Sequence, residues 1–88
     1  MTWRVYFSDK ADRQLDSIRE PDHSRLTRRI AALETHPHPP GAVPVQGTSY
    51  LRLRVGDWRV LYTIFAEVQI VRVAYILRRN ERTYGRLS

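Results

Sequence analysis

The chain of 88 residues has no cysteine, which excludes a disulfide scaffold and thiol chemistry and is compatible with a reducing compartment. No uninterrupted apolar run approaches membrane-spanning length, and no apolar signal segment follows Met1. We therefore expect neither export nor membrane insertion, and a cytoplasmic location. Lysine is also scarce, because Lys10 is the only one and the remaining 14 of the 15 basic residues are arginine.

Positive charge is what the chain has in excess. Its 15 basic residues outnumber its 9 acidic ones, which gives a net charge of +6 and a pI near 10.5. Such a charge predicts attraction to a polyanion, which could be nucleic acid, the ribosome, an anionic membrane surface or an acidic protein. Charge alone does not choose among these partners, although arginine is the better bidentate ligand for phosphate.

The first third of the chain is predicted to form a strand and two helices. Polar and apolar residues alternate over residues 2–7, which is typical of a strand with one buried face. Apolar residues at helical spacing then predict a helix that begins at Ser8 or Asp9 and is closed by Pro21. A second helix is expected to be capped by Asp22 and to lie antiparallel to the first.

The rest of the chain is predicted to be a loop followed by strands. Residues 36–47 hold four of the five prolines and two of the four glycines, so a connecting loop is expected there. Three successive strands are predicted at residues 49–55, 58–65 and 68–77, with a tight turn near residues 66 and 67. The tail after Leu77 is expected to form a turn or a short helix before Gly85.

The order β-α-α-β-β-β predicts a single α+β domain over residues 1–88, with a hydrophobic fraction of 42% that is adequate for its core. Two helices would cover one face of a mainly antiparallel, twisted sheet. The other face would be left for a partner or a substrate.

Residues 50–62, YLRLRVGDWRVLY, are the most informative stretch because they read as a β-hairpin. If Gly56 and Asp57 form the two-residue loop, Arg54 lies opposite Arg59, and Arg52 lies two positions along the same face. Like charges directly opposite each other destabilise a sheet, so the cluster is best explained by an anion held between the arginines. An RNA phosphate is the leading candidate, and a solvated surface is the plain alternative.

This hairpin, the strand VQIVRVAYIL and the closing RRNERTY resemble the RelE/ParE superfamily of bacterial toxin components over essentially the full chain. The resemblance implies the same βααβββ fold. It also implies a toxin of a type II toxin-antitoxin system that enters the ribosomal A site and cuts mRNA without metal or cofactor. The 2′-hydroxyl would attack the adjacent phosphate, leaving a cyclic phosphate and a 5′-hydroxyl. A cognate antitoxin protein is the implied partner, in a toxin-antitoxin hetero-oligomer.

The resemblance also implies roles for individual residues. Arg52 matches a basic residue in proton transfer or phosphate contact, and Arg59 matches the arginine that stabilises the extra charge at phosphorus. Arg79, or its neighbour Arg78, matches the arginine near the leaving group, and Tyr84 matches the aromatic residue that orients or stacks on a base. The residues expected to bind RNA besides these catalytic ones are Tyr50, Arg54, Arg78 and Arg82. Tyr50 stands where the best-known members carry another basic residue.

The chemistry of these side chains sets a limit on the predicted enzyme. RNA cleavage needs a base, charge stabilisation at phosphorus and a proton for the leaving oxygen, and arginine supplies only the second of these well. We therefore predict a slow enzyme that depends on positioning by the ribosome. No metal site is predicted, because His36 and His38 lack a third ligand. Trp58 and Tyr62 are assigned to packing.

Two other functions are compatible with the sequence. One is a ParE-like poison of DNA gyrase without nuclease chemistry, and the other is a degenerate member that only binds its antitoxin through the hairpin arginines. The terminal aromatic of RRNERTY favours the ribonuclease. For Arg78, Arg79 and Arg82, a basic tail that adds only nonspecific attraction is the competing interpretation.

Overall fold

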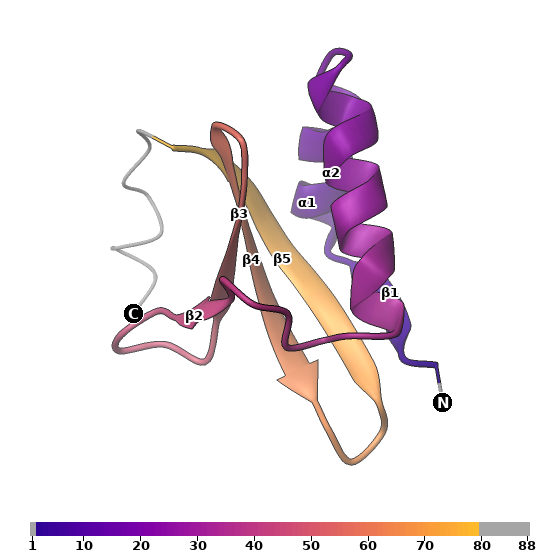
Figure 1. Cartoon of the computed structure of the whole chain (residues 1–88), viewed down its shortest axis with the longest axis vertical. Helices are drawn as coiled ribbons and strands as arrows, with labels where there is room; N and C mark the ends of the chain where they lie inside the picture. Colours follow the sequence, from indigo (N-terminus) through magenta and orange to yellow (C-terminus); the bar gives the residue numbers. More distant parts are fainter. Residues whose placement is uncertain (1, 80–88) are drawn as a thin grey trace.

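The computed structural model describes residues 2–79 of the chain (Figure 1). Its elements are β1 (Arg4–Phe7), α1 (Asp9–Asp16), α2 (Asp22–Ala31), the 3-10 turn η1 (Ala32–Glu34), β2 (Val43–Pro44), β3 (Leu51–Val55), β4 (Trp58–Phe65) and β5 (Ile70–Arg78). The predicted α+β class and the order of the helices and main strands are confirmed. The expected C-terminal turn or helix lies outside the described residues.

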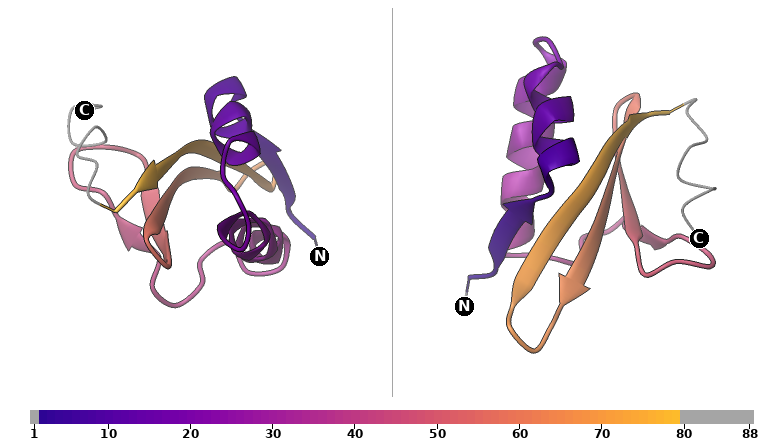
Figure 2. Two further views of the ribbon diagram at one scale, coloured as in Figure 1. Left: turned by 90° about the horizontal axis from the view of Figure 1, so that it is seen from above. Right: turned by 180° about the vertical axis from the view of Figure 1, so that it is seen from behind.

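The strands form one five-stranded sheet in the order β1-β5-β4-β3-β2. The pairs β2–β3, β3–β4 and β4–β5 are antiparallel, as the predicted meander requires, whereas β1 pairs with β5 in parallel. Both helices lie on one side of the twisted sheet and run in opposite directions (Figures 1 and 2). In the described part of the chain, the opposite face of the sheet carries no helix.

Helix α1 begins at a side-chain cap. The Oγ of Ser8 accepts a hydrogen bond from the backbone N–H of Ala11 at 3.0 Å, which satisfies a donor that the first turn leaves without a helical partner. The same hydroxyl donates to the carbonyl of Ala74 in β5 at 2.7 Å. The helix ends at Asp16, earlier than the prediction that Pro21 closes it, although Ile18 is still buried in the core.

The predicted cap of α2 at Asp22 is wrong, because Asp22 is the first residue of the helix and the carboxylate of Glu20 takes the capping role. Glu20 accepts hydrogen bonds from the backbone N–H of Ser24 at 3.0 Å and from the Ser24 hydroxyl at 2.8 Å. These bonds favour the ionised form, so they hold the pKa of the Glu20 carboxyl below its usual value. Leu26 and Ile30 lie one helical turn apart on α2 and are buried against the sheet.

The hydrophobic core lies between the helices and the sheet. Strands β1, β3, β4 and β5 contribute alternate residues to it because successive side chains point to opposite faces. Trp58 and Tyr62 belong to this core, which confirms their assignment to packing. The buried core residues of the strands are Leu51, Leu53, Val55, Trp58, Val60, Tyr62, Val71, Val73 and Ile76.

A β-bulge in β5 interrupts the regular register. Leu61 lies opposite Tyr75 while the next residue, Tyr62, lies opposite Val73, so Ala74 is the additional residue on β5. The side chain of Gln14 then reaches from α1 to accept a hydrogen bond from the Ile76 N–H at 2.9 Å. Gln14 of α1 thereby binds a backbone N–H of β5 beyond Val73, where the pairing with β1 ends.

Two details differ from the sequence prediction. Strand β5 starts at Ile70 because the turn from β4 is longer than a two-residue loop and includes Gln69 at a φ of 56°. The proline-rich stretch predicted to be a plain loop contains the two-residue strand β2, which pairs Val43 with Arg52. Proline at an edge strand is tolerated because its missing N–H faces away from the sheet.

Candidate functional site

The hairpin of β3 and β4 has the predicted register. Val55 lies opposite Trp58 and Arg54 lies opposite Arg59, so Gly56 and Asp57 form the two-residue loop. Gly56 has a φ of +58°, the left-handed value that such hairpin turns require and that glycine adopts without steric cost. The turn therefore fixes which side chains share a face.

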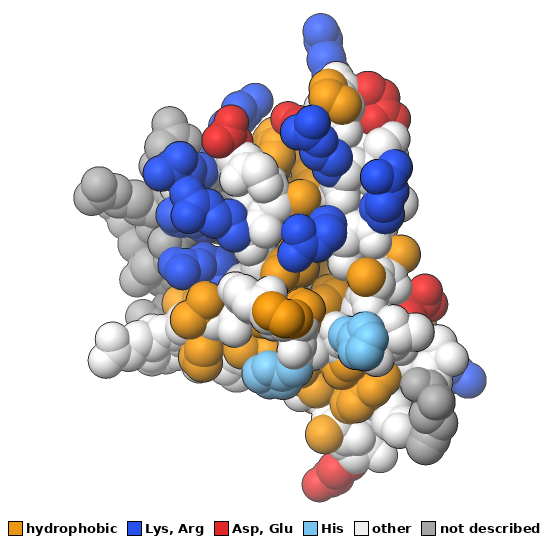
Figure 3. All heavy atoms as spheres, in the orientation of Figure 1, with side chains coloured by type: hydrophobic (Ala, Val, Ile, Leu, Met, Phe, Trp, Pro, Cys, Tyr) orange, Lys and Arg blue, Asp and Glu red, His pale blue; other side chains and the backbone are white. Residues whose placement is uncertain are grey.

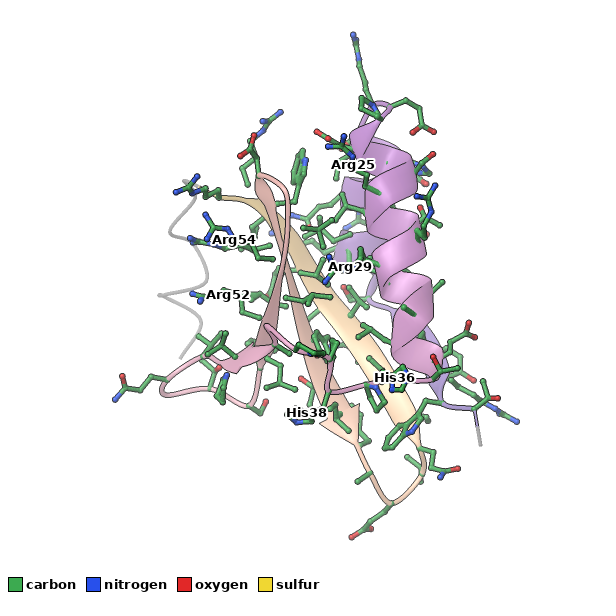
Figure 4. The ribbon with its side chains drawn as sticks, in the orientation of Figure 1. Arg25, Arg29, His36, His38, Arg52 and Arg54 are labelled. Atoms are coloured by element: carbon green, nitrogen blue, oxygen red, sulfur yellow. The ribbon has the colours of Figure 1, made fainter. Side chains whose placement is uncertain are left out.

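The arginines of this hairpin lie on the face opposite the helices. Because the leucines and valine of β3 point into the core, Arg52 and Arg54 must point the other way. Figure 4 shows both side chains directed to the same side of β3, away from α2. Figure 3 shows basic side chains gathered at this side of the molecule. We call the surface formed by Arg52, Arg54 and Arg59 the arginine face.

The floor of the arginine face is apolar. Leu61 lies opposite Arg52, and Leu77 lies opposite Arg59. Both leucines are buried, at 0% and 3% exposure, although no helix within residues 2–79 covers this side of the sheet. The Nε atom of Arg59 is buried as well. Cations beside an apolar floor interact more strongly with an anion than cations surrounded by water.

Arg52 and Arg54 form no ion pair within residues 2–79. The salt bridge that the described residues do form joins Arg25 to Asp22 on α2, at 3.9 Å. Among residues 2–79, no acidic side chain is placed to neutralise Arg52 or Arg54. This is the arrangement expected of a surface that receives an anion.

Arg79 lies next to the arginine face. Its backbone N–H donates to the carbonyl of Asp57 at 2.6 Å, which joins the end of β5 to the turn of the hairpin. The side chain of Arg79 is exposed. Tyr84 and Arg82, the other two predicted site residues of the C-terminal segment, lie outside the described residues.

Arg78 lies on the helix side of the sheet instead. Its guanidinium carbon is 4.7 Å from the centroid of the Trp58 ring, within the range of a cation–π contact. The Trp58 indole N–H donates to an Asp22 carboxylate oxygen at 3.0 Å. These residues line an open pocket of about 370 Å³ together with Ile18 and Glu20. The structure therefore does not bring Arg78 together with the arginine face.

Tyr50 lies at the edge of the arginine face and contacts another tyrosine. Its ring packs edge to face with that of Tyr75, with centroids 6.0 Å apart and an interplanar angle of 88°. The ammonium of Lys10 lies 5.6 Å from the centroid of the Tyr75 ring. Sequence reasoning missed Tyr75 and Lys10, because only the bulge and the start of α1 bring them to this face.

Tyr62 is a structural residue with a strongly perturbed hydroxyl. It is 0% exposed, and its O–H donates to the carbonyl of Pro37 at 2.9 Å. Burial disfavours the phenolate and raises the pKa of Tyr62 to about 12. Tyr62 therefore cannot serve as a proton carrier at neutral pH.

Residues 2–79 hold no group of three metal-ligating side chains, and the predicted loop histidines, His36 and His38, lie in the segment after α2 (Figure 4). No helix among them is long and apolar enough to cross a membrane.

The sequence model of the family described as "ParE toxin of type II toxin-antitoxin system, parDE" matches residues 5–83. The fold is similar to the archaeal RelE–RelB complex from Pyrococcus horikoshii, with 24% identity, a TM-score of 0.81 and coverage of 92% of this chain and 99% of that one. It is also similar to the Escherichia coli RelBE toxin-antitoxin complex, with 12% identity, a TM-score of 0.77 and coverage of 90% and 99%.

A third similar structure is the chromosomal ParDE system from Pseudomonas aeruginosa, with 11% identity, a TM-score of 0.70 and coverage of 88% of this chain and 96% of that one. No curated protein sequence matches the chain. At these identities the structural matches establish the fold, and the match to the family model establishes the ancestry.

Proposed function

This chain belongs to the ParE toxin family and is a toxin of a type II toxin-antitoxin system, and from that premise we propose that it cuts messenger RNA in the ribosomal A site. The proposed reaction takes place in the cytoplasm and uses neither metal nor cofactor. The RNA 2′-oxygen attacks the adjacent phosphorus and its proton is removed. The bond from phosphorus to the 5′-oxygen then breaks, and that oxygen takes up a proton. The products are a cyclic phosphate and a 5′-hydroxyl.

One observation carries this proposal, which is the register that pairs Arg54 with Arg59 and leaves Arg52 on the same face. Two guanidinium groups directly opposite each other destabilise a free sheet, and a bound phosphate removes that penalty. A phosphate can also accept two parallel hydrogen bonds from one guanidinium group. A surface that only contacts water has no need for this bidentate geometry. The buried apolar floor under these arginines strengthens their interaction with an anion.

The predicted residues other than Arg78 each have a role in this reaction. We assign Arg59 to the pentacoordinate phosphorus, because its partly buried guanidinium carries a fixed positive charge. Arg52 contacts the scissile phosphate, Arg79 lies near the leaving oxygen, and Tyr84 stacks on a base. The remaining RNA-binding residues of the proposal are Tyr50, Arg54 and Arg82. Since arginine is a poor acid and a poor base, turnover depends on positioning by the ribosome.

The proposed protein partner is a cognate antitoxin. Two of the similar structures are complexes of RelE with RelB, which supports a toxin-antitoxin hetero-oligomer for this chain. The net charge of +6 favours an acidic antitoxin segment. An antitoxin that covers the arginine face would block RNA by occupying the same guanidinium groups.

A second candidate function is poisoning of DNA gyrase. It is favoured by the family model, which is named for ParE, and by the similarity to the ParDE system. In that case the arginine face would bind a protein or DNA and no phosphodiester bond would be cut. The register of the hairpin is compatible with both, so cleavage itself is the discriminating measurement.

The experiment is induced expression followed by mapping of mRNA 5′ ends and measurement of plasmid supercoiling. We expect codon-phased cuts with the wild-type chain and none with Arg59→Ala. Tyr84→Phe, which keeps the ring, should retain most of the cutting. The matched control is Arg28→Ala, because Arg28 is exposed on α2 away from the arginine face.

The alternatives give different results in the same experiment. Intact messages with inhibited supercoiling would support the gyrase poison and overturn the nuclease. Intact messages and normal growth, with antitoxin binding retained, would identify a degenerate member. Equal loss of cutting in Arg28→Ala and Arg59→Ala would show that the arginine face has no special role.

A further inference from the structure

A second concave site lies beside the arginine face. It is a pocket of about 210 Å³ lined by Ser8, Lys10, Tyr50, Arg72, Ala74 and Tyr75. Its lining combines two aromatic rings with two cations, and no acidic residue within positions 2–79 contributes to it. Only Tyr50 among these residues was expected from the sequence to contact RNA.

The pocket is continuous with the arginine face through the register of the sheet. Arg52 on β3 lies opposite Leu61 on β4, and Leu61 lies opposite Tyr75 on β5. The three side chains therefore form one row across the side of the sheet opposite α1 and α2. Two strand spacings separate Arg52 from Tyr75, which is about 10 Å. A few nucleotides of single-stranded RNA can connect two sites at that separation.

The tyrosines offer ring surface rather than core packing. The rings of Tyr50 and Tyr75 stand at 88° to each other, so they form a corner instead of a closed stack. Both residues are partly exposed, unlike the fully buried Tyr62. An aromatic face that is reachable from solvent is the surface on which single-stranded bases stack.

The two cations of the pocket are available to an anion. Lys10 and Arg72 are exposed, and neither forms an ion pair within residues 2–79. The ammonium of Lys10 lies 5.6 Å from the centroid of the Tyr75 ring. The only lysine of the chain is therefore beside the ring on which, or next to which, a base would stack. A cation beside a stacking ring is the combination that binds a base together with its phosphate.

The position of Lys10 is fixed by the fold. Ser8 both caps α1 and donates a hydrogen bond to the carbonyl of Ala74, the additional residue of the bulge. These two bonds join the first turn of α1 to β5 next to Tyr75, whose side chain lies on the same side of the sheet as the arginine face. β-bulges are commonly found where a side chain has to be redirected beside a functional site.

We propose that this pocket is a second nucleotide subsite, in which the tyrosine corner stacks one base of the RNA while Lys10 and Arg72 bind an adjacent phosphate. The proposal rests on the proposed function, because it takes the ligand of the arginine face to be RNA. At about 210 Å³ the pocket is smaller than sites for drug-sized ligands, and it suits a single ring. The subsite would hold a base that flanks the cut and would set a preference at that position.

Two assays test the subsite. The first measures cleavage by ribosomes programmed with a defined mRNA, and the second measures binding of a short oligoribonucleotide whose 2′-hydroxyls are methylated, by fluorescence anisotropy. The variants are Lys10→Gln, Tyr75→Leu and Tyr75→Phe. Arg13→Gln is the control, because Arg13 is an exposed cation on the same helix that does not line the pocket. Thermal unfolding of each variant identifies any loss of fold.

We expect Tyr75→Leu and Lys10→Gln to raise KM about tenfold with little change in kcat, and to weaken oligoribonucleotide binding by a similar factor. The nucleotide preference beside the cut should also weaken. Arg13→Gln should behave as the wild type, since it removes a charge outside the pocket. Tyr75→Phe should weaken binding less than Tyr75→Leu, since it keeps the ring.

The outcomes separate this inference from the proposed function. Suppose that the wild type cuts RNA, and that folded Lys10→Gln and Tyr75→Leu show the same KM and nucleotide preference as the wild type. The proposed subsite is then wrong, and the proposed nuclease function is supported. If the wild type does not cut, the nuclease is wrong, and the anisotropy measurement alone decides the subsite. Equal oligoribonucleotide affinities for the wild type and both variants would then reject it.

Discussion

Arg54 and Arg59 lie directly opposite each other across the hairpin of β3 and β4, as a cross-strand pair of like charge. A pair of this kind costs stability in the free protein, since opposite charges at such positions stabilise a sheet and like charges destabilise it. Its presence is explained if the two guanidinium groups serve a ligand. Stability and function should therefore respond in opposite directions when this pair is changed.

The substitution Arg54→Glu should make the protein more stable and less active. It converts the like-charge pair into an opposite-charge pair, which should raise the free energy of unfolding by about 0.2–1 kcal/mol. RNA cleavage should fall because the arginine face loses a cation and gains an anion. Urea unfolding and cleavage assays check the two effects. Arg28→Glu on α2 makes the same charge change elsewhere, so an equal gain in its stability would contradict the explanation.

Trp58→Phe should lower stability while leaving activity unchanged. The substitution removes the indole N–H that donates to Asp22 and weakens the contact with Arg78. Because Asp22 is partly exposed to water, we expect a loss of about 1–2 kcal/mol. A double-mutant cycle with Asp22→Ala should give a coupling energy of at least about 0.5 kcal/mol. Additive effects of the two substitutions would show that the hydrogen bond contributes nothing.

Tyr62 should make the protein sensitive to alkali. Its pKa is raised from 10.0 in an unfolded chain to about 12 in the fold, so the folded state keeps a proton that the unfolded state releases. The stability that this residue provides is fully present below pH 10 and is lost as the pH rises toward 12. The loss should reach about 3 kcal/mol.

Tyr62→Phe isolates this effect. The variant should be less stable than the wild type at neutral pH by about 1–3 kcal/mol, because the carbonyl of Pro37 loses its donor. Its free energy of unfolding should fall less steeply between pH 10 and 12. Parallel pH profiles of the two proteins, measured by denaturant unfolding, would show that Tyr62 ionises no differently in the fold.

Gly56 should be needed for its backbone conformation alone. At a φ of +58° an alanine is strained, although its Cβ would meet no atom within 4 Å. Gly56→Ala should therefore cost about 1–2 kcal/mol through the backbone and not through a clash. Gly56→Asn should cost less, since asparagine tolerates the left-handed region better. Equal losses for the two variants in thermal unfolding would contradict this reason.

The features that the sequence predicted correctly are local ones. The hairpin register follows from a two-residue Gly-Asp loop and from alternation, so the shared face of Arg52 and Arg54 could be read from neighbouring residues. The amphipathic helices follow from apolar spacing over a few turns. In each case the determining residues lie within a few positions of one another.

The features that the sequence did not reveal depend on distant contacts. Nothing in residues 2–7 indicates that β1 pairs in parallel with β5, since alternation defines a buried face but not a neighbour. Arg78 and Arg79 look equivalent in the sequence, yet Arg78 packs on Trp58 while Arg79 joins the hairpin turn. The pocket at Tyr75 depends on the bulge at Ala74, which only the pairing with β4 makes visible.

The strand order places β5, the last strand of the described chain, between β1 and β4. During synthesis β1 and the two helices emerge first, but the strand against which β1 pairs is made some sixty residues later. The sheet, and with it the row formed by Arg52, Leu61 and Tyr75, therefore cannot be completed on the nascent chain until β5 has been synthesised.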